Sequence, residues 1–483
     1  MTLRREIWPR EKNRNYLEMT TRRDFIGTMA AVGAYTAVPH GFAAGTENVS
    51  LPLPTDAQRR WADMELGMFF HFDIQIYRPR WNFRSWKDYP DPALYNPVKL
   101  DTDQWMEAAK AMGAKYVVFV AKHCSGFLQW QTDLYPYGLK QAAWKGGKGD
   151  LVRDFVESAR RNGLLPGLYA SVSTNGFLGV DNPGLVKARG WLGEPSLETQ
   201  KRYAKVCEGM AEELYSRYGE LFEIWFDGGA LAPEKGGPDL LPIIEKHQPN
   251  AILFQGPAQA RNNIRWVGNE RGVAPYPCWA TGRDVTQSDG TKEEKGESFS
   301  GTPDGLKWMP GECDVPLGDG KWFCTMHQNR PYWTMDYLVN MYDRSVGRNC
   351  NLLLNAAPQP DGHIAENEMK IYAEFGRLIK GRYANKICVT EGEGNRVELA
   401  IPKDKGPVNQ VILMERIERG ERVREFALEA QLGDGGWREI YKGSCIGHKH
   451  IVRFDKIEAS RLRLSVSKSA ATPLIRDFSA YCN

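Results

Sequence analysis

Short apolar runs alternate with amphipathic stretches between about residues 60 and 385. Six apolar runs have the length of a β-strand, namely Leu66 to Phe72, Tyr116 to Ala121, Leu165 to Ala170, Leu221 to Phe226, Ala251 to Gln255 and Arg265 to Gly268. Three stretches between them have helical periodicity and end at or next to glycine, a common helix terminator: Asp103 to Met112, Asp150 to Arg161 and Leu197 to Tyr218. This alternation predicts an α/β fold with a parallel sheet wrapped by helices. Because eight such units need roughly 250 residues, we predict a (β/α)8-type barrel over residues 50–385.

The pattern changes after about Lys386. Short alternating segments follow one another with turns rich in Gly, Asp and Lys between them, and no helical pattern interrupts them; the segments are Arg396 to Ile401, Gln410 to Glu415, Glu425 to Ala430 and Arg461 to Val466. This texture predicts a C-terminal β-sandwich over residues 386–483. Trp437 and Tyr441 fit either ligand binding or packing, so the role of this domain stays open.

The N-terminal region has the features of an export signal. Paired arginines, Arg22 and Arg23, precede an apolar stretch from Ile26 to Val38, and small residues suited to cleavage end at Ala44. We interpret residues 1–44 as a twin-arginine signal, with Met19 as an alternative start after an upstream extension. The apolar stretch is too short and too rich in Gly and Ala for a membrane span, which needs about 18 apolar residues. We therefore expect an exported protein, periplasmic or secreted, that has no membrane association after cleavage.

Composition and charge narrow the classes of partner. The hydrophobic share of 42% is enough for a large core, and the formal net charge is only +3 from 63 basic and 60 acidic residues. Such a balance gives no basic surface for a phosphate backbone, so nucleic acid is not expected as a partner. Fifteen tryptophans suit stacking on the flat faces of sugars, although aromatic residues also fill cores.

Cysteine and histidine spacing gives no support for a metal or cofactor. The nine cysteines are scattered, with no CxxC pair and an odd total, which predicts buried free thiols in place of a zinc site or a disulfide framework. The eight histidines include no HExxH. His448 and His450 would lie on one face of a strand, and without carboxylates nearby they indicate a solvated face.

Polar side chains where the predicted strands end are the candidates for chemistry, because barrels of this kind place their working residues there. They are His71, Lys122, His123, Tyr169, Asp227, Asn269 and Glu270. Asp227 is followed by Gly228-Gly229, which allows a ligand close to the backbone. Two converging carboxyl groups are what glycoside hydrolysis needs. The structural alternatives remain open: Asp227 as a turn residue or helix cap, Glu270 as a solvated loop acid, and the histidines as core residues.

At these residues the chain resembles glycoside hydrolase family 29, the α-L-fucosidases, from about Trp61 to Cys482. Several motifs in order make the resemblance specific, namely Gly67-Met68-Phe69-Phe70-His71, Asp91-Pro92-Ala93-Leu94-Tyr95-Asn96-Pro97, Ala121-Lys122-His123, Gly126-Phe127, Trp144-Lys145-Gly146-Gly147-Lys148-Gly149-Asp150, Trp225-Phe226-Asp227-Gly228 and Asn351-Leu352-Leu353-Leu354-Asn355. The run from Arg265 to Glu270 looks like the branch that acts on α-1,3 and α-1,4 linkages.

The resemblance implies a retaining exo-α-L-fucosidase that hydrolyses terminal fucosyl linkages of an oligosaccharide or polysaccharide, without cofactor or metal. It implies Asp227 as the nucleophile and Glu270 as the acid/base. The residues expected to contact substrate are His71, Trp86, His123, Tyr169, Trp225, Trp279 and Glu312. Glu312 is also the main rival for the acid/base role, because we expect it in a loop, Pro310-Gly311-Glu312-Cys313-Asp314, that reaches the pocket; Glu294 is a further rival.

Two departures from the family pattern bear on specificity. Cys124 stands where the family usually has a second histidine, and Val172-Ser173-Thr174-Asn175 replaces a Trp-Asp-Arg-Asn-like run. A thiol cannot replace the hydrogen bond of an imidazole, so at least one sugar contact is changed. The alternatives are therefore an enzyme for another α-L-sugar, such as α-L-galactose, or a non-catalytic lectin-like barrel. Retention of both Asp227 and Glu270 favours an enzyme.

Overall fold

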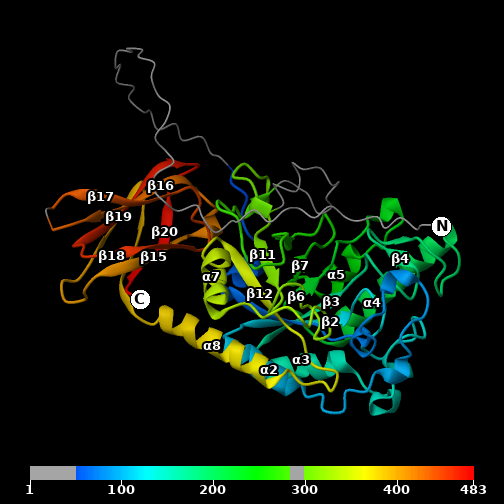
Figure 1. The fold of residues 1–483 in the computed structure, drawn as a ribbon. Helices are drawn as coiled ribbons and strands as arrows, with labels where there is room; N and C mark the ends of the chain where they lie inside the picture. The colour runs from blue at the N-terminus through cyan, green and yellow to red at the C-terminus, as the bar shows by residue number, and fades with distance from the viewer. Residues whose placement is uncertain (1–49, 283–298, 434) are drawn as a thin grey trace, which may run out of the picture. The chain divides into compact units, whose positions relative to one another are not determined.

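The computed structural model describes residues 50–282, 299–433 and 435–483. The predicted export signal therefore lies outside the described residues, as does Glu294. In the described part, parallel strands form a closed barrel in the order β1-β12-β11-β8-β7-β6-β3-β2 (Figure 1). The strands are β1 (Leu66–Phe70), β2 (Tyr116–Lys122), β3 (Leu165–Ala170), β6 (Glu223–Trp225), β7 (Ile252–Phe254), β8 (Asn263–Trp266), β11 (Gly311–Val315) and β12 (Cys350–Ala356).

Helices surround this barrel, namely α1 (Asp56–Met64), α2 (Thr102–Met112), α3 (Leu151–Arg161), α4 (Leu197–Arg217), α5 (Leu241–His247), α7 (Met335–Ser345) and α8 (Glu366–Arg382). Three of them, α2, α3 and α4, match the predicted amphipathic stretches. Asp101 and Asp150 cap α2 and α3 by accepting hydrogen bonds from backbone N–H groups of the first turn. The prediction of an α/β barrel is confirmed. The last two barrel strands, β11 and β12, were not predicted as strands, because Glu312, Asp314 and Asn351 interrupt their apolar pattern.

Successive residues of each strand face opposite sides, which divides the aromatic side chains into two layers. Phe69 points into the barrel, where its ring lies 5.1 Å from that of Trp225. Phe70 points outward and stacks on Trp105 of α2 at 5.5 Å. Gly67 faces inward, and a side chain there would meet the ring of Tyr116 at 2.5 Å. Aromatic rings such as those of Phe69, Tyr116 and Trp225 thus fill the barrel interior.

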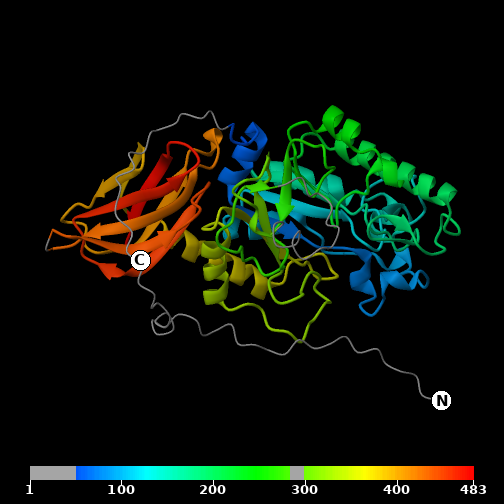
Figure 2. The same cartoon turned by 90° about the horizontal axis from the view of Figure 1, so that it is seen from above.

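The C-terminal region is a sandwich of two antiparallel sheets, β13-β20-β15-β18 and β14-β19-β16-β17, seen from above in Figure 2. Its strands are β13 (Lys386–Glu393), β14 (Arg396–Ala400), β15 (Val408–Glu415), β16 (Val423–Gln431), β17 (Trp437–Gly443), β18 (His450–Ile457), β19 (Arg461–Ser469) and β20 (Leu474–Tyr481). The predicted β-sandwich is confirmed. Four of these strands contain the alternating segments seen in the sequence.

The prediction that His448 and His450 lie on a solvated face was wrong. Both side chains are buried, at 6% and 3% exposure. His448 Nε2 lies 2.8 Å from a carboxylate oxygen of Asp63 in α1, and His450 stacks on Tyr276 at 4.7 Å. Both imidazole rings therefore contact residues that are distant in the sequence, and both contacts join the sandwich to the barrel.

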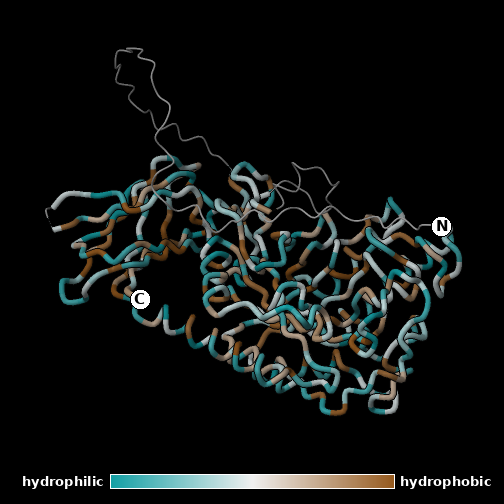
Figure 3. Tube along the Cα trace, viewed as in Figure 1, coloured by the Kyte–Doolittle hydropathy of each residue, from teal (hydrophilic) through white to brown (hydrophobic). Residues whose placement is uncertain are grey.

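All nine cysteines are free thiols and six of them are buried, as predicted. Figure 3 shows hydrophobic and hydrophilic residues mixed along the coloured part of the chain. Within the described ranges, no helix combines the length and apolar character that crossing a membrane requires.

Candidate active site

The site lies where the barrel strands end, and several strands each contribute a polar side chain. His71 directly follows β1, His123 follows β2, Tyr169 belongs to β3, and Asp227 comes two residues after β6. Asn355, near the end of β12, completes this side of the barrel. The structure therefore brings together residues that are up to 284 positions apart in the sequence.

Asp227 is held from three directions. The phenol of Tyr169 donates a hydrogen bond of 2.8 Å to its Oδ2. The hydroxyl of Ser173 donates to its backbone carbonyl, and the side-chain oxygen of Gln255 accepts from the next N–H, that of Gly228, at 3.2 Å. Gly228 has a φ of 72° and no room for a side chain, because a Cβ would meet the Asn182 amide nitrogen at 2.5 Å. The turn after β6 thus fixes the direction of the carboxylate.

The pKa of Asp227 is raised above its ordinary value. Burial is the main cause, and the negative charge of Glu270 adds to it, while the Tyr169 hydrogen bond and the positive charge of Lys122 act in the opposite direction. The two predicted catalytic carboxyl groups are therefore close enough to interact electrostatically.

Glu270 lies beyond the end of β8 on an exposed turn, with a φ of 50°. The indole N–H of Trp322 donates to its Oε2 at 3.0 Å. Asn269 shapes the turn, since its side chain accepts from the N–H of Arg271 and donates to the carbonyl of Val273. Asn269 therefore supports the loop, and Glu270 is the group of this pair that remains available to a ligand.

His71 is oriented by an amide whose own direction is fixed. The Asn355 Nδ2 donates to the carbonyl of Trp322 at 2.9 Å, so its Oδ1 must be the acceptor for His71 Nδ1 at 2.6 Å. Burial lowers the pKa of His71 to about 3. The ring is therefore neutral, with its proton on Nδ1 and an acceptor at Nε2, which suits a hydroxyl donor.

His123 stacks against Tyr169, with ring centroids 5.8 Å apart and planes inclined by 19°, and Phe323 meets it edge-on at 5.0 Å. Burial and the neighbouring His71 and Lys122 hold the pKa of His123 well below its usual value. Both histidines are consequently neutral groups in an aromatic surround.

The structure corrects the expectation for Glu312. This residue lies on β11, not in a loop, and it is fully buried in the barrel interior. Its carboxylate accepts hydrogen bonds from the phenol of Tyr116 at 2.7 Å and from the indole of Trp225 at 3.0 Å. Glu223 of β6 lies beside it, and burial together with their mutual charge raises the pKa of Glu223 well above normal. Glu312 is therefore enclosed in the barrel interior and has no exposed surface to offer a ligand.

Two of the predicted tryptophans also differ from expectation. Trp225 is only 5% exposed and stacks on Phe254 at 3.7 Å, so it supports Tyr169 from below and offers no open face. Trp279 is only 6% exposed, and the guanidinium of Arg424 in β16 lies over its ring at 4.9 Å. Both were predicted as substrate contacts, and in this structure other side chains pack against both rings.

The remaining predicted residues have separate roles. Trp86 is half-buried at the end of the short helical turn Phe83–Ser85. That turn packs near Cys124, because a Cβ added at Gly176 would lie 2.8 Å from the carbonyl oxygen of Phe83 and 3.4 Å from that of Cys124. Lys122 is fully buried and donates to the carbonyls of Ser171 and Thr174, at 2.6 Å each. It holds the loop after β3 and is not open to a ligand.

Sequence reasoning missed Trp322, Phe323, Asn355 and Asp314. The Trp322-Phe323 pair was detectable as two large rings in a polar, glycine-rich stretch, and Asn355 as the polar residue closing an apolar run. Asp314 accepts from the indole of Trp266 at 2.6 Å, and burial, with Glu270 nearby, raises its pKa well above normal. Nothing in the sequence pairs Asp314 with Trp266.

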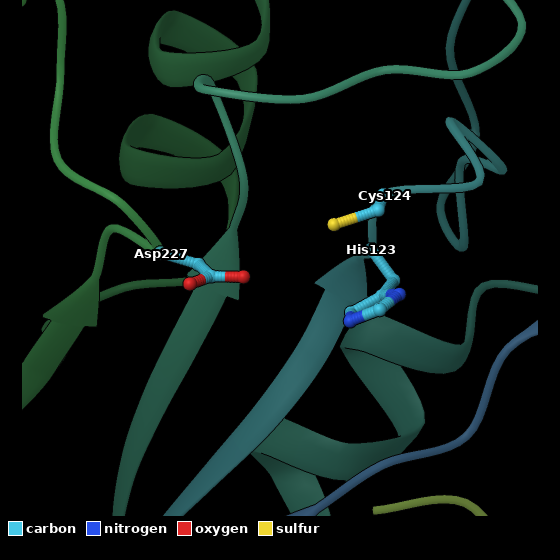
Figure 4. Close-up of side chains that lie close together, drawn as sticks. All are labelled: His123, Cys124 and Asp227. Atoms are coloured by element: carbon cyan, nitrogen blue, oxygen red, sulfur yellow. The ribbon is translucent and has the colours of Figure 1, made fainter. Parts of the chain in front are cut away.

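Cys124 enters the site directly. Ligand atoms of His123, Cys124 and Asp227 all lie within 4.8 Å of one another, and Figure 4 shows the three side chains directed toward a common space. Sequence spacing did not indicate this group, because His123-Cys124 and Asp227 come from different strands. It is the one set of three metal-ligating side chains found in the described ranges.

Comparisons with known proteins agree with this geometry. A sequence model of the family described as α-L-fucosidase matches residues 47–382. The chain is 28% identical to α-L-fucosidase 1 of Arabidopsis thaliana, over 89% of this chain and 88% of that protein. It is 31% identical to a rice protein provisionally named α-L-fucosidase 1, over 89% and 85% of the two chains. A solved structure from Bacteroides thetaiotaomicron, also provisionally named an α-L-fucosidase, superposes with a TM-score of 0.83 at 36% identity, covering 90% of this chain and 100% of that one.

The chain thus has a closed barrel with carboxylates, neutral imidazoles and aromatic rings at its strand ends. The match to the family model covers most of the chain. The chain belongs to the α-L-fucosidase family, glycoside hydrolase family 29, and is a glycoside hydrolase.

Proposed function

We propose that this protein is a retaining exo-α-L-fucosidase in which Asp227 is the nucleophile and Glu270 the general acid/base. The observation that carries the proposal is the environment of Asp227, which is fixed by Tyr169 and electrostatically coupled to Glu270. A retaining enzyme needs its two carboxyl groups about 5 to 5.5 Å apart, so that one attacks the anomeric carbon while the other protonates the leaving oxygen. No group among the described residues other than Glu270 combines exposure with this electrostatic contact to Asp227.

In the first step, the Asp227 carboxylate bonds to the anomeric carbon, and Glu270 gives its proton to the departing oxygen. The carboxylate charge of Asp227 is thereby lost, which allows Glu270 to take a proton from water in the second step. Water then breaks the glycosyl-aspartate bond and returns both groups to their starting states. His71, His123 and Tyr169 would bind hydroxyls of the sugar beside the reacting carbon, with the Trp322 ring as an apolar wall 4.9 Å from His71.

We further propose that the glycan is α-1,3- or α-1,4-linked, on the basis of the run from Arg265 to Glu270. The main competitor is an α-L-galactoside, which differs from an α-L-fucoside by one hydroxyl. Cys124 supports this alternative, because a thiol is smaller than the imidazole that the family usually has there and leaves more room beside Asp227.

The paired arginines and small residues of segment 1–44 support export from the cell as the setting for this activity.

A substrate panel tests the proposal. Purified protein is assayed on aryl α-L-fucoside, aryl α-L-galactoside and branched Lewis-type oligosaccharides, while NMR follows the anomer that is formed first. The expected result is fucose released as its α-anomer. Release of the β-anomer would contradict the retaining mechanism, and faster release of galactose than fucose would change the assigned sugar. Cys124→His should increase activity on Lewis-type substrates if the missing imidazole limits them; equal rates before and after this change would show that the departure is neutral.

A further inference from the structure

The strand ends beside Asp227 bring together a set of side chains that sugar hydrolysis does not require in this combination. An imidazole nitrogen of His123, the thiol sulfur of Cys124 and a carboxylate oxygen of Asp227 lie within 4.8 Å of one another and point to a common space (Figure 4). We propose that this group is a binding site for a soft divalent metal ion such as Zn²⁺ or Cd²⁺. The bound ion occupies the reacting carboxylate and inhibits the enzyme.

Ligand chemistry identifies the class of ion. Nitrogen, sulfur and carboxylate oxygen are the three donor types that zinc takes from proteins, and an open zinc site has three protein ligands and a water. Metal–ligand bonds of about 2.0 to 2.3 Å place tetrahedral ligands roughly 3.3 to 3.8 Å apart, so these side chains need to close by at most about 1 to 1.5 Å. Hard ions such as Mg²⁺ and Ca²⁺ prefer six or more oxygen ligands and are not expected to bind.

The local charges favour a divalent cation. On binding, the Cys124 thiol loses its proton to solvent, so the site then presents one thiolate and one carboxylate. Two positive groups act on Cys124, and both have other partners: the Lys122 ammonium is directed to the carbonyls of Ser171 and Thr174 at 2.6 Å each, and Arg84 pairs with Asp181 at 3.2 Å. The two positive groups beside these two negative ligands are therefore already engaged elsewhere.

The ligands are also positioned before any ion arrives. Tyr169 holds Asp227 through a hydrogen bond of 2.8 Å and stacks on His123 at 5.8 Å. Cys124 is only 8% exposed, so a small ion reaches its sulfur more readily than a bulky thiol reagent does. Apart from the closure described above, the fold therefore meets part of the cost of ordering the site, which favours binding.

Ion binding is tested directly by titrating Cd²⁺ into the full chain and following the ultraviolet absorption of the cadmium–thiolate bond. Wild type is compared with Cys124→Ser and with Cys324→Ser, which removes a more exposed thiol outside the proposed ligand set. The expected result is an equivalent of tight binding that Cys124→Ser lacks and Cys324→Ser keeps. Identical titrations for wild type and Cys124→Ser would overturn the site.

Inhibition is tested with Zn²⁺ on an aryl α-L-fucoside, with each variant compared with its own rate without metal. We expect reversible inhibition that a chelator removes and that weakens with rising substrate, and at least about tenfold weaker inhibition of Cys124→Ser, since loss of one ligand contact costs at least that much affinity. The inhibition test rests on the proposed catalytic role of Asp227, whereas the cadmium titration tests ion binding alone and does not. Equal inhibition of wild type and Cys124→Ser, or cadmium binding at Cys124 without inhibition, would contradict an ion on the reacting carboxylate.

Discussion

The phenol of Tyr169 in β3 donates a hydrogen bond of 2.8 Å to Oδ2 of Asp227, which follows the neighbouring strand β6 by two residues. This bond stabilises the ionised carboxylate and opposes the effect of burial, which raises the pKa of Asp227. This donor favours the charged form of Asp227, which the proposed nucleophile role requires.

Replacing Tyr169 by Phe should remove this stabilisation while keeping the ring. Since a hydrogen bond to a charged group contributes about 1.5 to 3 kcal/mol, turnover should fall roughly 10- to 100-fold. The pKa of Asp227 should rise, so the acidic limb of the pH–rate profile should move to higher pH. Tyr203→Phe is the matched control, because Tyr203 is equally buried but donates to the carbonyl of Val172 at 2.7 Å. An unmoved acidic limb in Tyr169→Phe would show that Asp227 does not govern it.

Asp227→Asn should fold and bind sugar but lose turnover by roughly three orders of magnitude or more, because the covalent route is closed. A 2-fluoro-glycosyl inactivator should label wild type on the peptide that contains Asp227, as read by mass spectrometry. Asp133→Asn, at an exposed position, is the control for an isolated loss of charge. A label on another carboxylate would remove Asp227 from the nucleophile role.

Glu270→Ala should leave formation of the glycosyl-enzyme fast for substrates with good leaving groups, which need no protonation. The variant should slow hydrolysis of the glycosyl-enzyme, which needs a general base. External azide should then restore turnover and give a glycosyl azide with retained anomeric configuration, because the small anion fills the space left by the carboxylate. Glu312→Ala should show no such rescue, since Glu312 is fully buried in the barrel interior. If azide instead rescues Glu312→Ala and not Glu270→Ala, the two roles are reversed.

The buried pair Glu223 and Glu312 should make stability depend on pH. Burial raises the pKa of both groups, so the folded state keeps protons that the unfolded chain releases above its ordinary value of 4.5. The folded state then binds more protons than the unfolded state, and the free energy of unfolding should fall as pH rises from about 4.5 toward neutrality. Glu312→Gln should flatten this fall in urea unfolding measured between pH 5 and 8, while the exposed control Glu157→Gln should not. A slope unchanged by Glu312→Gln would place the titration elsewhere.

The periodicity of the chain determined the architecture. Apolar runs such as Leu165 to Ala170, separated by amphipathic stretches with capped ends, require a parallel sheet covered by helices, because both faces of such strands must be buried. The positions of His71, Tyr169 and Asp227 at strand ends followed from the same pattern, since parallel strands bring their ends to one side of a barrel.

Only the tertiary structure decided which polar residues are open to a ligand. Glu312 and Glu270 look alike in sequence, yet strand β11 turns Glu312 into the barrel toward Tyr116 and Trp225, while Glu270 stands on a turn outside it. Trp279 lies under Arg424, a residue far along the chain. The thiol of Cys124 meets Asp227 across two strands. Such contacts depend on register, closure of the barrel and packing between distant segments, and local residue patterns do not encode them.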